Sequence, residues 1–133
     1  MNINYSFERP LELQDVQRLL KQTDWASDRD IPGIEKMLEN SFLTIGVWDD
    51  DRLIGFTRVL ADGIYRALID DVVVDESYRG KGIGTEMMKH LLSRLEQVEE
   101  VFLRTGKEMV PFYERLGFAL NRGAMMDWER HFM

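Results

Sequence analysis

The sequence predicts a single α/β domain in which helices flank a mixed, mostly antiparallel sheet of six or seven strands. Three observations support this prediction. The 133 residues fit one domain and leave no room for a second. Hydrophobic residues make up 44% of the chain, which is enough to bury a core. Strand-like and helix-like segments alternate along the chain, and no internal repeat interrupts them.

The first part of the chain predicts a strand, two helices and a hairpin. Apolar and polar residues alternate over residues 3–7, as in a half-buried strand. Apolar residues at helical spacing predict a helix over 13–22, and Pro32 suits the first turn of a second helix over 32–40. The hairpin comprises strands over 42–48 and 53–60, joined by an acidic turn at 49–51.

The second part predicts one long helix among short elements. Asp62 and Gly63 form a turn before a strand over 65–74, and an apolar face of Ile, Met and Leu predicts a helix over 82–96. The remaining elements are a strand over 101–103, a helix over 110–116 ended by Gly117, a strand over 118–120 and a segment over 125–128 that could close the sheet.

Composition argues against several classes of function. The formal net charge is −7, so the chain lacks the clustered Lys and Arg that bind nucleic acid or an anionic membrane, and its acidity suits a cationic substrate such as an amine. There is no cysteine, hence no disulfide, thiolate metal site or cysteine nucleophile. His90 and His131 have no metal-ligand spacing, so no metal is expected. No signal peptide or long apolar run is visible, and we expect a cytoplasmic location.

A glycine-rich loop carries the clearest chemical signal. A valine-rich strand leads through a short turn into Arg79-Gly80-Lys81-Gly82-Ile83-Gly84 at the start of the long helix. The first amides of a helix have no internal partners and carry the positive end of its dipole, and glycines let a phosphate approach the backbone. The loop therefore predicts a site for an anion such as a diphosphate. The alternative is a turn that caps the helix without a ligand. The spacing differs from that of a P-loop and of the dinucleotide fingerprint.

Two segments resemble a known family. The pattern Arg79-x-x-Gly82-x-Gly84 after a valine-rich strand is similar to the first signature of the GNAT superfamily of N-acetyltransferases. The run from Pro111 to Phe118 resembles its second signature, a short helix with a tyrosine before Gly-Phe. The resemblance covers essentially the whole chain and is looser from Gly123 onward. It implies a GNAT-type fold.

The resemblance also implies an activity and a set of binding residues. The activity is transfer of an acetyl group from acetyl-CoA to a primary amine; because the chain has no cysteine, direct transfer in a ternary complex is expected. By position in the family, the N–H of Val72 would face the thioester oxygen and Val74 the pantetheine amide. The implied acetyl-CoA-binding residues are Val72, Val73, Val74, Arg79, Gly80, Lys81, Gly82, Ile83, Gly84 and Thr85. Trp25, Arg29 and Arg58 are the candidates for binding the acceptor.

Two residues are candidates for moving protons. Asp70 and Asp71 lie inside an apolar strand, and alternation is expected to send them to opposite faces. The resemblance favours Asp71 as the general base, with Asp70 in reserve; a solvated or salt-bridged role remains the alternative. Tyr113 is the candidate general acid that protonates the leaving thiolate, and its alternative role is that of a core aromatic.

Other questions stay open at this level. The acceptor is a small amine, a polyamine, an amino-acid-like amine or a protein lysine. A competing function is that of a non-catalytic module that senses acetyl-CoA. A homodimer is plausible, because a C-terminal strand with Trp128 and Phe132 could pair with a second copy.

Overall fold

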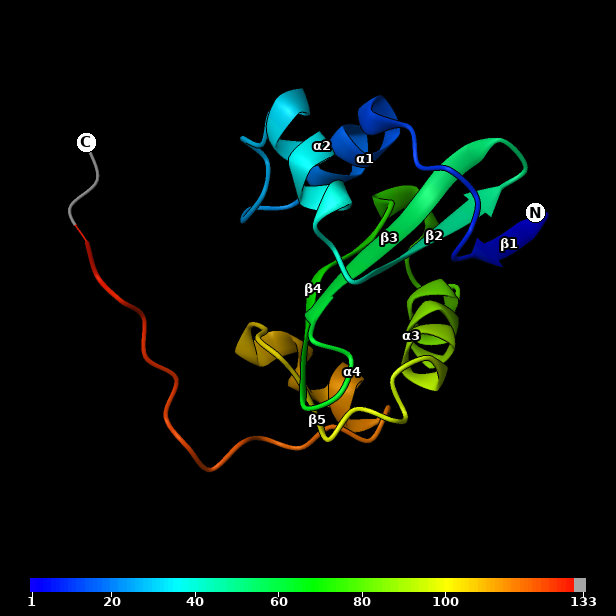
Figure 1. Ribbon diagram of the computed structural model, residues 1–133. Coiled ribbons are helices and arrows are strands. Elements are labelled where there is room, and N and C mark those ends of the chain that lie inside the picture. Colours follow the sequence, from blue (N-terminus) through cyan, green and yellow to red (C-terminus); the bar gives the residue numbers. More distant parts are fainter. Residues whose placement is uncertain (131–133) are drawn as a thin grey trace.

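A computed structural model describes residues 1–130, so His131 and Phe132 lie outside the described residues. Five strands form one sheet in the order β1-β2-β3-β4-β5 (Figure 1). Neighbouring strands are antiparallel except β4 and β5, which are parallel. In chain order the strands and α-helices are β1 (Ile3–Ser6), α1 (Leu13–Leu20), α2 (Ile31–Glu39), β2 (Leu43–Asp49), β3 (Arg52–Ala61), β4 (Arg66–Val74), α3 (Ile83–Ser93), β5 (Glu100–Leu103) and α4 (Val110–Glu114).

The sheet separates two layers of helices, each with its own core. On one face α1 and α2 cover a cluster that includes Leu19, Ile34 and Phe56. On the other face α3 and α4 cover a larger cluster that includes Ile69 and Met87. Within residues 1–130, no helix has both the length and the apolar character needed to cross a membrane. The mixed, mostly antiparallel α/β class is confirmed.

The number of strands is lower than the six or seven predicted. Residues 118–120 and 125–128 form no strand, so both of these predictions are wrong. Gly117 ends α4 with φ of 100°, as expected, and the amide of Phe118 donates to the carbonyl oxygen of Tyr113. After that the chain leaves the body, and residues 119–130 are all exposed (Figure 1). Strand-forming residues need a neighbouring strand, and this segment pairs with none within residues 1–130.

Strand β4 is irregular at the point that matters for the site. Its pairing with β5 runs from Arg66↔Glu100 to Ile69↔Leu103 and stops there, so no strand of the described part of the chain flanks the second half of β4 on that side. Its pairing with β3 skips a position between Phe56 and Arg58. Asp71 adopts a left-handed backbone with φ of 56°, as a bulged residue does. The sheet therefore opens between β4 and β5 just before the glycine-rich loop.

Candidate functional site

The glycine-rich loop ends in the exposed N-terminus of α3. The amides of Ile83, Gly84 and Thr85 have no acceptor within residues 1–130, since the first bond of the helix runs from the Glu86 amide to the Gly82 carbonyl. Among the described residues, no side chain caps this end with a hydrogen bond. Three free amides at the positive end of a helix dipole form a ready site for an anion.

Two glycines keep this helix end accessible. Gly80 and Gly82 have φ of 76° and 81°, a conformation that other residues rarely adopt. A Cβ atom built on either of them would meet no atom within 4 Å. The space beside the free amides is thus open, and only the absence of side chains keeps it so.

The side chains of the loop differ in what they can offer to a ligand. Arg79 and Lys81 are exposed, and the Nε of Arg79 donates to the Val74 carbonyl oxygen at 3.0 Å. Ile83 is buried in the core, so only its amide can bind. Thr85 is half-buried in the first turn of α3. The loop therefore combines backbone donors with two cations, on a chain of net charge −7.

The loop, β4 and α4 meet at the opening in the sheet. A Cβ atom built on Gly84 would lie 3.5 Å from the Phe112 ring and 3.6 Å from a Val74 methyl group. Val72 and Val74 are half-buried against the α3 core, whereas Val73 is buried under α1 and α2. Val73 can therefore contact a ligand in the opening only through its backbone.

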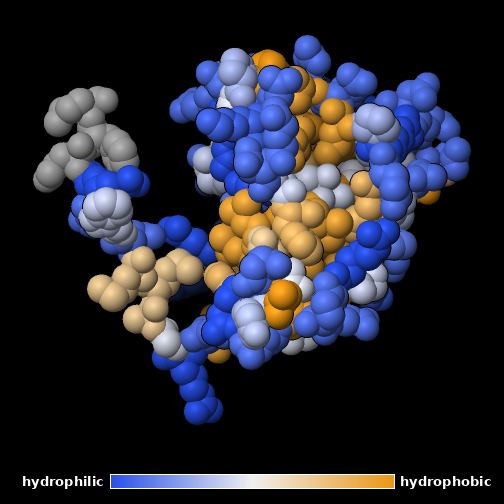
Figure 2. Space-filling model, in the orientation of Figure 1, coloured by the Kyte–Doolittle hydropathy of each residue, from blue (hydrophilic) through white to orange (hydrophobic). Residues whose placement is uncertain are grey.

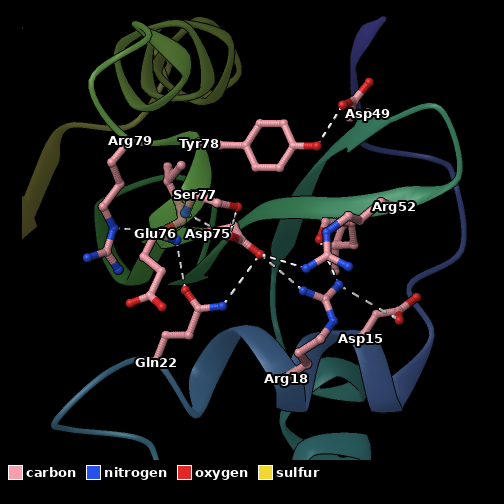
Figure 3. Close-up of polar contacts among 12 residues, drawn as sticks. Asp15, Arg18, Gln22, Asp49, Arg52, Asp75, Glu76, Ser77, Tyr78 and Arg79 are labelled. Carbon is pink, nitrogen blue, oxygen red and sulfur yellow. Dashed lines mark hydrogen bonds and ion pairs between the residues drawn. The ribbon is translucent and has the colours of Figure 1, made fainter. Parts of the chain in front are cut away.

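The turn before the loop is held by a buried carboxylate (Figure 3). The Oδ2 of Asp75 accepts from Arg18 and Arg52 at 3.3 Å each and from Gln22 at 3.4 Å. Its Oδ1 accepts from the amide and the hydroxyl of Ser77 at 3.0 and 2.7 Å. Burial alone would raise the pKa of Asp75, but the bonds from Ser77 and Gln22 and the charge of Arg52 hold it below its usual value. These contacts fix the start of the loop to α1 and β3.

Sequence reasoning missed this anchor, although it leaves a local signal. An aspartate followed two residues later by serine, directly after a strand, is a capping pattern, and Asp75 caps the short 3₁₀ helix at Glu76–Tyr78. The partners Arg18 and Arg52 are distant in sequence and carry no such signal. A second bond, from the Tyr78 hydroxyl to Asp49 at 2.6 Å, ties the same turn to the end of β2 (Figure 3).

Asp71 lies at the centre of a second polar cluster. Its Oδ2 accepts from Arg29 and from Arg58 at 2.6 Å each, and its side chain is 0% exposed. Its Oδ1 accepts from the indole N–H of Trp25 at 3.0 Å. The structure therefore brings the three predicted acceptor-binding residues together around one carboxylate.

Asp70 and Asp71 do not lie on opposite faces, so that prediction is wrong. Arg58 donates to Asp71 and also to Asp70, at 3.2 Å. The bulge at Asp71 breaks the alternation of β4, so both carboxylates reach the same guanidinium. Asp70 differs from its neighbour in being 39% exposed.

The surroundings of Asp71 keep it ionised. Burial alone would raise its pKa, but the hydrogen bonds and charges of Arg29 and Arg58 outweigh this and hold the pKa below its usual value. A carboxylate with a lowered pKa and both oxygens engaged is a weak proton acceptor at neutral pH. These contacts suit a residue that positions the two arginines. The prediction that Asp71 acts as the base remains untested.

A shallow pocket adjoins this cluster. Its volume is about 420 Å³, and it is lined by Asp28, Arg29, Asp30, Gly33, Met37 and Arg58. Nε and Nη2 of Arg29 and Nη1 of Arg58 have no acceptor within residues 1–130. Trp25 is 56% exposed beside this cluster and belongs to the same α1–α2 connection. The pocket therefore offers both cationic and anionic groups to a ligand.

Tyr113 lies in α4 with its ring in the core. The ring contacts Phe112 and Phe118 edge-on, with centroids 4.9 and 5.8 Å apart. Its hydroxyl has no hydrogen-bond partner within residues 1–130, yet no fully buried polar side-chain atom there lacks one, so the hydroxyl oxygen reaches the surface. Burial raises the pKa of Tyr113 to about 12. The phenol is therefore protonated at neutral pH and free to donate.

Fold and site together define an α/β protein with an anion-accepting helix end beside an opened pair of strands. Comparison with known proteins identifies the family. The model of the acetyltransferase (GNAT) family matches residues 7–118. The chain belongs to this family, as the two signatures in its sequence implied.

Individual relatives agree with the family assignment. An uncharacterized N-acetyltransferase, ycf52-like, from Prochlorococcus marinus is 37% identical over 122 residues, which cover 87% of this chain and 67% of the relative. Serotonin N-acetyltransferase 2, chloroplastic, from rice is 33% identical over 101 residues, covering 69% of this chain and 49% of the relative. A solved GNAT-family acetyltransferase from Streptococcus pneumoniae superposes with a TM-score of 0.83 at 26% identity, covering 97% of this chain and 99% of that one.

Proposed function

We propose that this protein is an N-acetyltransferase that transfers an acetyl group from acetyl-CoA to a primary amine, directly and in a ternary complex. One observation carries the proposal: three unpaired amides and two open glycines lie at the helix end beside the opened strands. A pyrophosphate suits this end, and an extended amide-containing chain suits a strand edge without a neighbour. Family membership supports acetyl-CoA as the ligand of this site, since GNAT proteins use acetyl-CoA.

In this proposal different residues of the opening bind different parts of acetyl-CoA. The amides of Ile83, Gly84 and Thr85 hold the pyrophosphate, and Arg79 and Lys81 add charge. The backbone of Val72, Val73 and Val74 holds the rest of the molecule along β4. Acetyl-CoA supplies an activated acyl group. The end of the β4–β5 pairing at Ile69 leaves backbone groups of β4 facing the opening, where they can bind the thioester oxygen.

The acceptor occupies the pocket next to Asp71. An amine of pKa near 10.4 is neutral in only about one molecule in 2,500 at pH 7, so a proton acceptor is needed. We propose that Asp71 mainly positions Arg29 and Arg58, and that Asp71 itself, Asp70 or water takes the proton. Relatives bear the names serotonin N-acetyltransferase and histone acetyltransferase, so both small amines and lysines are reasonable acceptors.

Tyr113 is proposed to protonate the leaving thiolate. Its pKa of about 12 lies roughly 3.5 units above that of a thiol near 8.5, which makes the full transfer uphill by about 5 kcal/mol in the free protein. A thiolate that forms beside the hydroxyl would accept a hydrogen bond from it. This charge-assisted bond would reduce the free-energy cost of the proton transfer. The free, protonated hydroxyl is the observation that supports the role.

A thiol-release assay with a panel of amines tests the proposed function. The panel should pair each amine with an analogue that carries an added carboxylate, because the pocket offers free guanidinium nitrogens as well as Asp28 and Asp30. Release of coenzyme A that depends on one class of amine supports the enzyme. Tight binding of acetyl-CoA with no release for any amine would favour the alternative, a non-catalytic module that senses acetyl-CoA.

Gly82→Val should weaken acetyl-CoA binding by about 100-fold, measured by titration calorimetry. A valine places a branched side chain in the open space beside the free amides and strains a backbone with φ of 81°. Loss of one or two charge-assisted hydrogen bonds corresponds to about 3 kcal/mol. Arg79→Ala should weaken binding less, and the loss should shrink with added salt.

Gly117→Val is the matched control for this variant. Gly117 also has a positive φ, 100°, and open surroundings, but it follows α4 instead of preceding α3. It should therefore share the backbone strain and leave the affinity for acetyl-CoA nearly unchanged. Unchanged affinity in a folded Gly82→Val protein would count decisively against the loop as the pyrophosphate site.

A homodimer and a cytoplasmic location remain predictions from the sequence. Two relatives are named as chloroplastic, so members of this family also occur in plastids.

A further inference from the structure

The two arginines beside Asp71 keep hydrogen-bond donors that their own chain does not use. Arg29 and Arg58 each donate one N–H to the Oδ2 of Asp71, at 2.6 Å. Nε and Nη2 of Arg29 and Nη1 of Arg58 have no acceptor among the described residues. Both side chains line the pocket of about 420 Å³. Guanidinium donors of this kind match a carboxylate, whose two oxygens accept several N–H groups at once.

Asp71 fixes these donors before a ligand arrives. Its side chain is 0% exposed, and those of Arg58 and Arg29 are 11% and 31% exposed. A guanidinium that is already held by a buried carboxylate loses little rotational freedom when a ligand binds to it. The pocket therefore contains a preformed site for an anionic group.

Other carboxylates near the arginines require that the ligand also carries a positive charge. Asp28 and Asp30 line the same pocket. Asp70 is 39% exposed and lies directly across from Arg58 in the sheet. Together with Asp71 these carboxylates outnumber the guanidinium groups, so they repel an anion that has no cation of its own. A molecule with both an ammonium and a carboxylate group satisfies both kinds of residue.

Apolar side chains continue the same face of the sheet beyond Arg58 and Asp70. Leu60 pairs with Leu68, and Leu68 pairs with Phe102, so these three side chains form one row across β3, β4 and β5, called the apolar row here. Two residues along a strand return to the same face, which places the row beside Arg58 and Asp70. None of the three belongs to either core cluster of the described residues, and Leu60 is 37% exposed. Figure 2 shows apolar atoms gathered over β3 and β4, below the hydrophilic surface of α1 and α2.

We propose that the acceptor is an amino acid with an apolar side chain. Its carboxylate binds Arg29 and Arg58, its ammonium lies beside Asp70, and its side chain covers the apolar row. Two residues along a strand span about 7 Å, a distance that phenylalanine bridges from its carboxylate to its ring. This inference rests on the proposed acetyltransferase function and names the substrate class.

The reaction on such an acceptor is balanced without a further reactant. The amine nitrogen forms a bond to the acetyl carbon, and the carbon–sulfur bond of the thioester breaks. Of the protons on the ammonium group, one is lost to solvent and one ends on the sulfur of coenzyme A. The products are the N-acetyl amino acid and the free thiol.

Three acceptors that differ in one group test the role of the carboxylate. Release of coenzyme A should show a kcat/KM for phenylalanine at least tenfold above those for phenylalaninamide and phenethylamine, because the free guanidinium donors are left without an acceptor by the last two. The amine of phenylalaninamide is less basic than that of phenylalanine, so this preference cannot come from a larger neutral fraction. Equal or faster release with amines that lack a carboxylate overturns this inference alone. No release with any amine contradicts the proposed function itself, and the inference with it.

Arg29→Lys tests whether the arginine reads the carboxylate. A lysine can still pair with Asp71 but lacks the further donors of the guanidinium group. The ratio of kcat/KM for phenylalanine to that for phenylalaninamide should therefore fall about tenfold, whereas a purely structural role would lower both values alike. Arg66→Lys is the matched control, because Arg66 is an exposed arginine of β4 that pairs with Glu99, and it should keep the ratio. An unchanged ratio in Arg29→Lys overturns the assignment of the carboxylate site.

Leu60→Ser tests the apolar row. The preference for phenylalanine over alanine, measured as a ratio of kcat/KM values, should fall about tenfold because the row loses apolar area that the ring covers. Leu120→Ser makes the same change at a leucine that is 75% exposed and follows α4, and it should keep the preference. The same preference in Leu60→Ser and in the wild type overturns the placement of the acceptor side chain on this row.

Discussion

Asp71→Asn should lower the free energy of unfolding by roughly 3 kcal/mol. The substitution keeps the shape of the side chain and suits the left-handed backbone at this position, where φ is 56°. It removes the buried negative charge that pairs with both Arg29 and Arg58. Leaving charges unpaired in a buried site typically costs 3–5 kcal/mol, and the partial exposure of Arg29 argues for about the lower figure. The midpoint temperature of thermal unfolding, Tm, should fall by on the order of 10 °C.

Asp70→Asn is the matched control, because it makes the same change one residue away. Asp70 is 39% exposed and its ion pair with Arg58 is longer, at 3.2 Å. Its Oδ1 also accepts from the Asp71 amide, which an asparagine oxygen can still do. This variant should lose about 1 kcal/mol or less. Equal losses in the two variants would mean that the Asp71 cluster does not hold the fold together.

Measuring the free energy of unfolding as a function of pH is a second test of whether the charge of Asp71 stabilises the fold. The pKa of Asp71 in the folded state lies below its unfolded value of about 3.9, so its charge stabilises the fold above that pH. This stabilisation is lost as the pH falls through the folded-state pKa. The difference in free energy of unfolding between wild type and Asp71→Asn should therefore stay constant from about pH 5 to pH 8 and decrease below about pH 4.

Turnover of the same variant distinguishes positioning from base catalysis. If Asp71 takes the proton of the amine, Asp71→Asn should lose kcat most at low pH, where fewer amine molecules are neutral. If it holds Arg29 and Arg58 in place, the variant should show a raised KM for the acceptor and a pH profile of kcat like that of the wild type. The two outcomes separate the role that the family resemblance implies from the role that the contacts favour.

Local patterns predicted most of the fold because most elements are decided locally. The long helix, the hairpin and the strand before the loop each follow from periodicity and turn residues, and their bounds differ from the prediction by no more than three residues. The glycine-rich loop was found for the same reason. Its strand, its glycines and its helix are consecutive, so the free amides of Ile83 to Thr85 follow directly from the sequence.

The remaining features depend on contacts between distant residues. The bulge at Asp71 depends on how β3 and β4 pair, and it turned Asp70 toward the same arginine as its neighbour. The Asp75 anchor gathers Arg18 and Arg52 from separate elements. Residues 125–128 have the side chains of a strand, but no strand pairs with them within residues 1–130. Periodicity carries no information about any of these.

Tyr113→Phe should reduce turnover by roughly 10²- to 10⁴-fold, the usual contribution of a positioned acid. The substitution removes one oxygen and keeps the ring between Phe112 and Phe118. Because the hydroxyl has no partner within residues 1–130, its removal breaks no bond of the fold, and stability and acetyl-CoA affinity should stay nearly unchanged. Tyr65→Phe makes the same change at an exposed tyrosine and should leave turnover unaltered.

The acidity of the leaving thiol shows whether Tyr113 acts on it. A donor with a more acidic thiol than coenzyme A needs less help from a proton, so the loss caused by Tyr113→Phe should shrink with such a donor. A loss that is the same for both donors would place the effect in binding or in another step. A phenylalanine variant with full activity would make Tyr113 a core aromatic and leave protonation of the thiolate to water. Because the pKa of Tyr113 is about 12, the phenol protonates a thiolate only if the site offsets roughly 5 kcal/mol.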